Sequence, residues 1–281
     1  MAASAMSADL KALFDKNAQA YEITTKSITR SVARHLLTLT PPITSDSIIH
    51  DNACGPGIVT DEILKLYKVQ SPPGAPAPRI EATDYAKGMI DIVNSFIDTK
   101  GWTSVRATLM DGQDLSEFHD GEFSLTITNF GIFAMPDPAR GASEIYRTLK
   151  PGGTAVVTHW NNPRNLEILN VVQRAIRPDL PTFSPVSKEW LQEGKLERTL
   201  QAGGFGSDDI KVTQTTVEMK FKDIEELKEH FSGPFWAQAR KGWTEEDCGK
   251  WDGAVMDALT EREKRECIIE MVTFIAVVKM N

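Results

Sequence analysis

A short glycine turn and three acidic residues are the part of this sequence whose types and spacing best suit chemistry. Gly55 and Gly57 follow an apolar run that ends in Asp51, a pattern typical of a strand, a tight turn and a helix starting at Ile58. Glycine lets the backbone bend sharply and approach a ligand closely. Such turns also occur in α/β proteins without a ligand, so the neighbouring segments decide their meaning.

The next two acids follow two further predicted strands. Asp84 closes a strand at 79–83, where a carboxylate can accept hydrogen bonds from a ribose diol bound over the glycine turn. It can equally cap the following helix, and the two roles are compatible. Asp111 follows a strand at 104–110 and can accept from an exocyclic amine, although Asp-Gly also marks plain turns.

Two more strands complete this edge of the predicted sheet. Asn129 and Phe130 follow a strand at 123–129, and His159 ends a strand at 154–159. Ligands of open α/β sheets bind along the carboxyl ends of the strands. His159 is therefore the histidine best placed to act as a general base, or else it makes a structural hydrogen bond at a strand end.

Regular alternation of strands and helices from residue 48 to 159 predicts an α/β protein with a parallel sheet covered on both faces. A helical pattern over 9–39, ended by Pro41, precedes it. After Trp160 the alternation loosens, and two strands are predicted at 210–217 and 268–278. The intervening aromatic, helical segment is too long for a loop and predicts a lid, unless its aromatic residues only dock it onto the sheet.

Composition limits the class of protein. The chain has 281 residues and a formal net charge of −8, which favours one core with insertions and argues against nucleic-acid binding. Three widely spaced cysteines suggest neither disulfides nor a zinc site, and no metal is expected. No apolar run reaches the length of a membrane span, and the start lacks a secretory signal. We expect a soluble, cytoplasmic protein that binds no membrane.

Taken together, these motifs resemble those of the class I S-adenosylmethionine-dependent methyltransferases. The ordered set is Asp51-x-x-Cys54-Gly55-x-Gly57, Asp84, Asp111-Gly112, Asn129-Phe130 and Leu149-Lys150-Pro151-Gly152-Gly153. The resemblance covers residues 14–160 and is strongest to the small-molecule branch that contains ubiquinone and menaquinone methyltransferases and fungal secondary-metabolite enzymes. It implies a Rossmann-like, mostly parallel sheet whose last strand is antiparallel.

The resemblance also implies which residues bind S-adenosylmethionine, which becomes S-adenosylhomocysteine. The cofactor-binding residues would be Tyr21, Asp51, Cys54, Gly55, Gly57, Asp84, Tyr85, Met89, Asp111, Gly112, Gln113, Asn129 and Phe130. A dinucleotide-binding dehydrogenase is a poor second interpretation, because Thr60 stands where a third glycine is expected and Asp84 comes late.

The expected substrate is a small, largely apolar or aromatic natural product. Its site would be formed by Tyr21, Phe130, Phe133, His159, Trp160, Phe183, Phe235 and Trp236. We expect O-methylation in secondary-metabolite biosynthesis. The alternatives are S- or N-methylation, a cyclase or non-catalytic cofactor-binding protein with this fold, and a protein methyltransferase. The substrate, the acceptor atom and the choice between monomer and homodimer are left open.

The predicted organisation has three parts. Residues 1–45 form an N-terminal helical cap, residues 46–222 and 267–281 form the Rossmann-like core, and residues 223–266 form a helical lid insertion.

Overall fold

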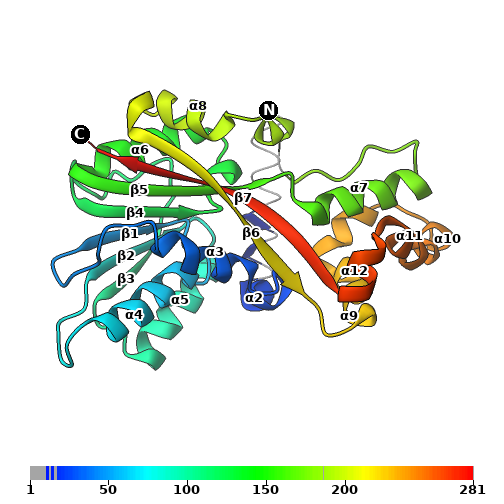
Figure 1. The fold of residues 1–281 in the computed structure, drawn as a ribbon, viewed down its shortest axis with the longest axis horizontal. Coiled ribbons are helices and arrows are strands. Elements are labelled where there is room, and N and C mark those ends of the chain that lie inside the picture. The colour runs from blue at the N-terminus through cyan, green and yellow to red at the C-terminus, as the bar shows by residue number, and fades with distance from the viewer. Residues whose placement is uncertain (1–10, 13, 16–17, 186, 281) are drawn as a thin grey trace.

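The computed structural model describes residues 11, 12, 14, 15, 18–185 and 187–280. At its centre lies a seven-stranded sheet with the order β3-β2-β1-β4-β5-β7-β6 (Figure 1). Its strands are β1 (Ile48–Asn52), β2 (Arg79–Asp84), β3 (Val105–Leu109), β4 (Phe123–Asn129), β5 (Leu149–Asn161), β6 (Ile210–Lys220) and β7 (Ile268–Lys279). Strands β1 to β5 pair in parallel, and β7 is antiparallel to both neighbours. The predicted fold class is therefore confirmed.

Helices cover the central strands on both faces. Ile49 in β1 and Ile127 in β4 are fully buried, as continuous hydrophobic strands of parallel sheets usually are. Two core clusters lie on opposite sides of the sheet. One includes residues of α3 (Ile28–Leu37), α4 (Ile58–Gln70) and α5 (Lys87–Lys100). The other includes residues of α6 (Pro138–Thr148) and α8 (Lys195–Ala202), as Figure 1 shows.

The N-terminal region differs from the single helical pattern predicted over 9–39. Its described part contains η1 (Ala18–Ala20), α2 (Tyr21–Thr24) and then α3. Lys26 and Ser27, between α2 and α3, both have positive φ angles, of 50° and 57°. Two successive left-handed residues cannot continue an α-helix, so the chain turns here. The expected helical residues Asp9, Leu10 and Leu13 lie outside the described residues.

A helical insertion separates β6 from β7. It contains α9 (Ile224–Ser232), η5 (Pro234–Arg240), α10 (Glu245–Gly249), α11 (Trp251–Ala258) and α12 (Glu261–Glu266). Figure 1 shows these helices, with α7 (Arg164–Ile176), at the far end of the long β6–β7 ribbon, away from β1 to β3. Trp251, fully buried, anchors this group. The remaining elements are the short helices η2 (Ile132–Ala134), η3 (Lys188–Leu191) and η4 (Ser207–Asp209).

Within the described part of the chain, none of the helices combines the length and the apolar character that crossing a membrane would require.

Candidate active site

Asp51, a residue of β1, fixes the glycine turn to this strand. Oδ2 of Asp51 accepts hydrogen bonds from the Thr60 backbone N–H at 3.0 Å and from the Thr60 hydroxyl at 2.7 Å. These bonds tie the end of β1 to the first turn of α4. Burial raises the pKa of Asp51 to about 7. Gly55 and Gly57 have φ angles of +54° and +79°, which glycine adopts without steric cost.

Above the turn lies a cavity with about 710 Å³ of empty space, which we call the rim cavity. It opens at the carboxyl ends of β1, β2 and β4. The predicted cofactor residues that line it are Tyr21, Gly55, Asp84, Tyr85, Met89, Asp111, Gly112, Gln113, Asn129 and Phe130. The lining residues that the sequence did not single out for cofactor binding are Phe14, Ala53, Met110, Gly131, Ala134, Met135 and Pro136.

Asp84 is the central acceptor of the rim cavity. Its Oδ2 accepts from the Gly55 N–H at 2.9 Å and its Oδ1 from the Ala86 N–H at 2.8 Å. Burial raises its pKa to about 6. A carboxylate can accept about four hydrogen bonds. Each oxygen therefore keeps capacity for a hydroxyl of a ligand, so the capping role and the diol-binding role coexist.

Two glycines make the walls of the rim cavity suitable for close contact with a ligand. A Cβ added to Gly55 would meet no protein atom within 4 Å, so it would occupy the cavity itself. A Cβ added to Gly112 would stand 2.5 Å from Cε of Met135 and 2.9 Å from Oδ1 of Asn52, which leaves room only for glycine. Gly55 therefore leaves open space for an adenosine-like group, whereas Gly112 is needed for close packing against Met135 and Asn52.

Three of the predicted cofactor residues do not line the rim cavity. Asp51 and Gly57 support the turn, and a Cβ added to Gly57 would lie 3.2 Å from Cγ2 of Val93. Cys54 is buried, and its thiol donates to the Gly55 carbonyl at 3.3 Å. These three residues act on the shape of the turn, Asp51 from within β1 and the other two from the turn itself.

A second cavity, with about 910 Å³ of empty space, adjoins the first, and we call it the aromatic cavity. The two cavities share the lining residues Phe14, Tyr21, Phe130 and Ala134. All predicted substrate residues except His159 line the aromatic cavity: Tyr21, Phe130, Phe133, Trp160, Phe183, Phe235 and Trp236. The sequence missed the lining residues Thr24, Thr25, Ile28, Thr29, Pro163, Asn165, Leu166, Pro185, Met219, His230 and Met271.

Phe130 forms part of the wall common to both cavities and has a strained backbone. Its φ angle of +61° is unusual for a bulky residue. A chain of hydrogen bonds holds it there: the Phe130 N–H donates to the Thr158 hydroxyl at 2.9 Å, and this hydroxyl donates to Oδ1 of Asn129 at 2.9 Å. Nδ2 of Asn129 in turn donates to the Thr29 carbonyl at 3.3 Å. The junction is thereby fixed to α3.

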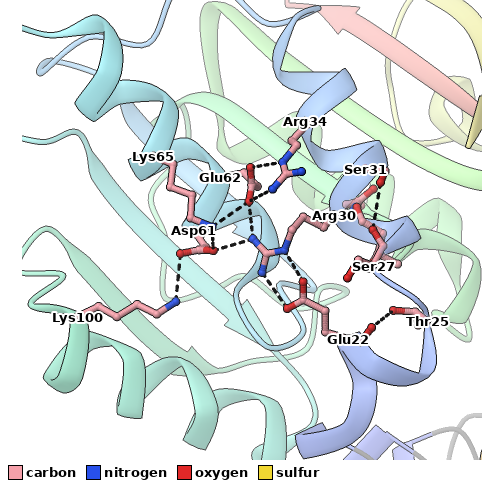
Figure 2. Close-up of polar contacts among 12 residues, drawn as sticks. Glu22, Thr25, Ser27, Arg30, Ser31, Arg34, Asp61, Glu62, Lys65 and Lys100 are labelled. Carbon is pink, nitrogen blue, oxygen red and sulfur yellow. Dashed lines mark hydrogen bonds and ion pairs between the residues drawn. The ribbon is translucent and has the colours of Figure 1, made fainter. Parts of the chain in front are cut away.

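An ion-pair network holds the helix that carries Tyr21 (Figure 2). Nη1 of Arg30 lies 2.6 Å from Oδ2 of Asp61, and Nη2 of Arg30 lies 2.8 Å from Oε2 of Glu22. Arg30 also pairs with Glu62. The hydrogen bond from Arg30 is the main cause that lowers the pKa of Glu22. Since Glu22 follows Tyr21 directly, the network positions the Tyr21 ring over the two cavities. Burial raises the pKa of Tyr21 to about 12, so its hydroxyl stays protonated.

The position of His159 differs from the prediction. Successive residues of β5 point to opposite faces of the sheet. The Trp160 ring faces the aromatic cavity, whereas the His159 ring lies on the other face, 5.2 Å from the Trp190 ring and 5.4 Å from the Phe274 ring. Burial lowers the pKa of His159 to about 4. The structure thus places His159 in an aromatic cluster outside the aromatic cavity, although it lines a small separate pocket with the predicted substrate residues Phe133 and Trp160.

His230 in α9 is the histidine that lines the aromatic cavity. Sequence reasoning passed over it because nothing in a helical pattern indicates that His230 shares a cavity with residues as distant in the sequence as Tyr21 and Phe130. No residue with an acidic or basic side chain other than His230 lines this cavity among the described residues. Its wall is therefore close to neutral.

Comparisons with known proteins agree with this geometry. Residues 49–153 match the family described as a methyltransferase domain. The chain is 29% identical to methyltransferase ucsB of Acremonium over 64% of this chain and 62% of that protein, just under two thirds of its length. It is 24% identical to the acetylaranotin bis-thiomethyltransferase of Aspergillus terreus, over 69% of this chain and 68% of that protein.

A solved structure with a similar fold is phosphoethanolamine N-methyltransferase 2 of Haemonchus contortus, in complex with phosphomonomethylethanolamine and S-adenosylhomocysteine. The TM-score is 0.57 at 17% identity, and the match covers 95% of this chain and 58% of that chain. Four observations agree with a methyltransferase fold: the glycine turn, the acid at the end of β2, the sheet order and these similarities. Residues 49–153 therefore match a methyltransferase domain, and the chain is similar to methyltransferases in sequence and to a methyltransferase bound to S-adenosylhomocysteine in fold.

Proposed function

We propose that the protein transfers the methyl group of S-adenosylmethionine to a small, largely apolar or aromatic metabolite held in the aromatic cavity. The observation that carries the proposal is that Phe14, Tyr21, Phe130 and Ala134 line both cavities. A ligand in the rim cavity and a ligand in the aromatic cavity would meet at these residues. Such an arrangement favours direct transfer, because holding two reactants together removes much of the entropic barrier.

In this proposal each part of the chain has a separate role. Asp84 would hold the ribose hydroxyls, Tyr85 and Met89 would lie beside the adenine, and the Gly112 backbone would contact the ring edge. S-adenosylmethionine supplies a methyl group bound to a positively charged sulfur. Phe130 and Tyr21 would exclude water from the point of transfer. The apolar wall near Phe235 would bind the metabolite by hydrophobic burial.

Oxygen as the acceptor atom stays a prediction, and the side chains on the cavity wall support one kind of oxygen acceptor over another. No carboxylate or lysine lines the aromatic cavity among the described residues. An alcohol needs a general base, whereas a phenol has a pKa of about 10 and a thiol a pKa of about 8.5. The neutral wall therefore favours an acidic hydroxyl, such as a phenol or enol.

A thiol is the second candidate acceptor, and the same neutral wall supports it. A thiol ionises near neutral pH without help from a protein base. The Aspergillus terreus relative, 24% identical, is named a bis-thiomethyltransferase. Cytoplasmic location and the choice between monomer and homodimer also stay predictions.

Calorimetry with S-adenosylmethionine, S-adenosylhomocysteine and NAD tests the cofactor part of the proposal. We expect the first two to bind and NAD to be rejected, because the charged residues that line the described rim cavity are the carboxylates Asp84 and Asp111, which repel phosphates. Asp84→Asn should weaken binding by about 10- to 100-fold, the value of hydrogen bonds to a charged group. Asp91→Asn, on the exposed side of α5, is the matched control.

Mass spectrometry tests the transfer itself. Phenols, enols, thiols and amines are incubated with the protein and S-adenosylmethionine, and each is examined for the gain of one methyl group together with formation of S-adenosylhomocysteine. Phe235→Ala and Trp236→Ala should raise the KM for an accepted compound. Trp243→Ala in the same insertion, which does not line the aromatic cavity, should leave that KM unchanged. An unaltered KM in the first two variants would contradict the substrate wall.

A further inference from the structure

His230 stands out because it is the imidazole on the wall of a largely apolar cavity, whose other described polar lining residues are Tyr21, Thr24, Thr25, Thr29 and Asn165. It lies on α9 and lines the aromatic cavity together with Trp236 and Phe235. The rings of Phe221 and Phe231 lie 5.2 Å from its imidazole in edge-on contacts. The proposed methyl transfer so far gives this side chain no role.

A hydrogen bond to Trp236 determines which nitrogen of His230 carries the proton. Nε1 of Trp236 lies 3.3 Å from Nε2 of His230. An indole N–H can only donate, so Nε2 must act as the acceptor. The neutral imidazole then carries its hydrogen on Nδ1. His230 consequently has no free lone pair for a general base and presents one N–H donor.

The surroundings keep His230 in this neutral form. Burial is the main cause that lowers its pKa, to about 4, and the nearby charge of Lys26 lowers it further while Glu226 raises it. Lys26 and Glu226 are themselves paired at 2.6 Å. At neutral pH the imidazole is therefore an uncharged donor with a defined orientation.

Among the described residues, no group accepts a hydrogen bond from Nδ1 of His230, so the ligand of the cavity is the available partner. We propose that His230 is a specificity-determining residue that donates from Nδ1 to a carbonyl oxygen of the substrate. The substrate class is thus an apolar, ring-containing molecule that carries a ketone, quinone or lactam carbonyl. A molecule without this acceptor leaves the N–H unpaired on binding, which costs affinity. The identity of this molecule as the methyl acceptor rests on the proposed function.

A pair of probes that differ only at the carbonyl tests the donor directly. 1-Acetonaphthone and 1-ethylnaphthalene share the same ring and side-chain length, but only the first has a carbonyl oxygen. Their dissociation constants are measured by quenching of tryptophan fluorescence, with and without S-adenosylhomocysteine. In the wild-type protein the ketone should bind about 5- to 10-fold more tightly, which is the usual effect of one hydrogen bond.

The His230→Phe variant should bind both probes equally, with the affinity for 1-ethylnaphthalene changed less than twofold. The His230→Gln variant, whose amide is also a donor, should keep part of the preference for the ketone, and it serves if the Phe variant does not fold. Equal binding of both probes by the wild-type protein, binding of neither, or a preference that survives in His230→Phe would overturn the proposal. Absence of methyl transfer would refute the proposed function and leave the probe result unaffected.

Discussion

Phe130 and Trp160 stack face to face, with ring centroids 3.9 Å apart and ring planes inclined by 13°. Phe130 follows β4 and Trp160 lies near the end of β5, so the stack joins two adjacent strands at the rim. Both rings line the aromatic cavity, and Phe130 also lines the rim cavity. The pair provides a flat surface against which a planar substrate can stack next to the cofactor.

Replacing Phe130 with alanine should remove this surface and leave the left-handed backbone in place. We expect turnover of an accepted substrate to fall at least 10-fold and the free energy of unfolding to fall by about 3 kcal/mol, as for other large aromatic truncations. Phe205→Ala, at a buried ring that packs on Tyr146 in the other core cluster, is the control. It should lose similar stability in urea unfolding, with the KM values unchanged.

The two glycines of the turn should respond differently to alanine. In Gly55→Ala the added methyl group would occupy the rim cavity, so calorimetry should show affinity for S-adenosylmethionine reduced at least 10-fold. The left-handed backbone adds a cost of about 1 kcal/mol to folding. In Gly57→Ala the methyl group would press on Val93 at 3.2 Å, so stability should fall more than affinity. The reverse order of effects would show that the turn does not contact the cofactor.

The raised pKa of Asp51 predicts a dependence of stability on pH. Its pKa is about 7 in the folded protein and about 3.9 in the unfolded chain. The folded state therefore holds a proton that the unfolded state has lost, and the stability from this group is fully present below pH ~4 and lost as pH rises through ~7. Between pH 5 and 7.5, urea unfolding should show the wild-type protein losing roughly 2 kcal/mol more than Asp51→Asn. Parallel pH profiles for the two proteins would contradict this ionisation.

Loss of Arg30 should destabilise the protein more than loss of Arg34. Arg30→Ala would leave the buried carboxylates of Asp61 and Glu62 without their main buried cation (Figure 2), a change that typically costs about 3 kcal/mol. It should also weaken cofactor binding, because α2 would no longer hold Tyr21 in place. Arg34→Ala is the control, since its side chain is 60% exposed and its pair with Glu62 should contribute about 1 kcal/mol or less. Urea unfolding and calorimetry on both variants distinguish a positioning network from ordinary surface charges.

The sequence predicted the parallel half of the sheet well because two local signals coincide there. Apolar runs such as the one in β4 end at polar or glycine residues, and strands of a parallel sheet must be buried on both faces. The break at Lys26 could not be predicted in the same way. Its side chain pairs with Glu226, 200 positions away, and no local pattern reports such a partner.

The candidate site likewise contains residues that could be predicted from the sequence and residues that could not. Asp84 could be predicted because it stands directly after a predicted strand, and Gly55 and Gly112 because they lie in the turns that follow two other predicted strands. His159 also follows from that rule, yet the rule does not tell on which face of the sheet a side chain lies. An error of one position along a strand exchanges the two faces, and here it separates His159 from Trp160. His230 was missed because its place depends on how the insertion packs against residues that are distant in the sequence.

The strand order also has a consequence for the timing of folding during synthesis. In the sheet, β7 lies between β5 and the edge strand β6. The ribosome makes β6 first, then the whole insertion, and only then β7. β6 therefore joins the sheet only after β7 has been made. Until β7 leaves the ribosome, β6 has no neighbouring strand to pair with, and the insertion that carries Phe235 and Trp236 is joined to the sheet at neither end. The nascent chain can therefore complete the cofactor half of its site well before it can enclose a substrate.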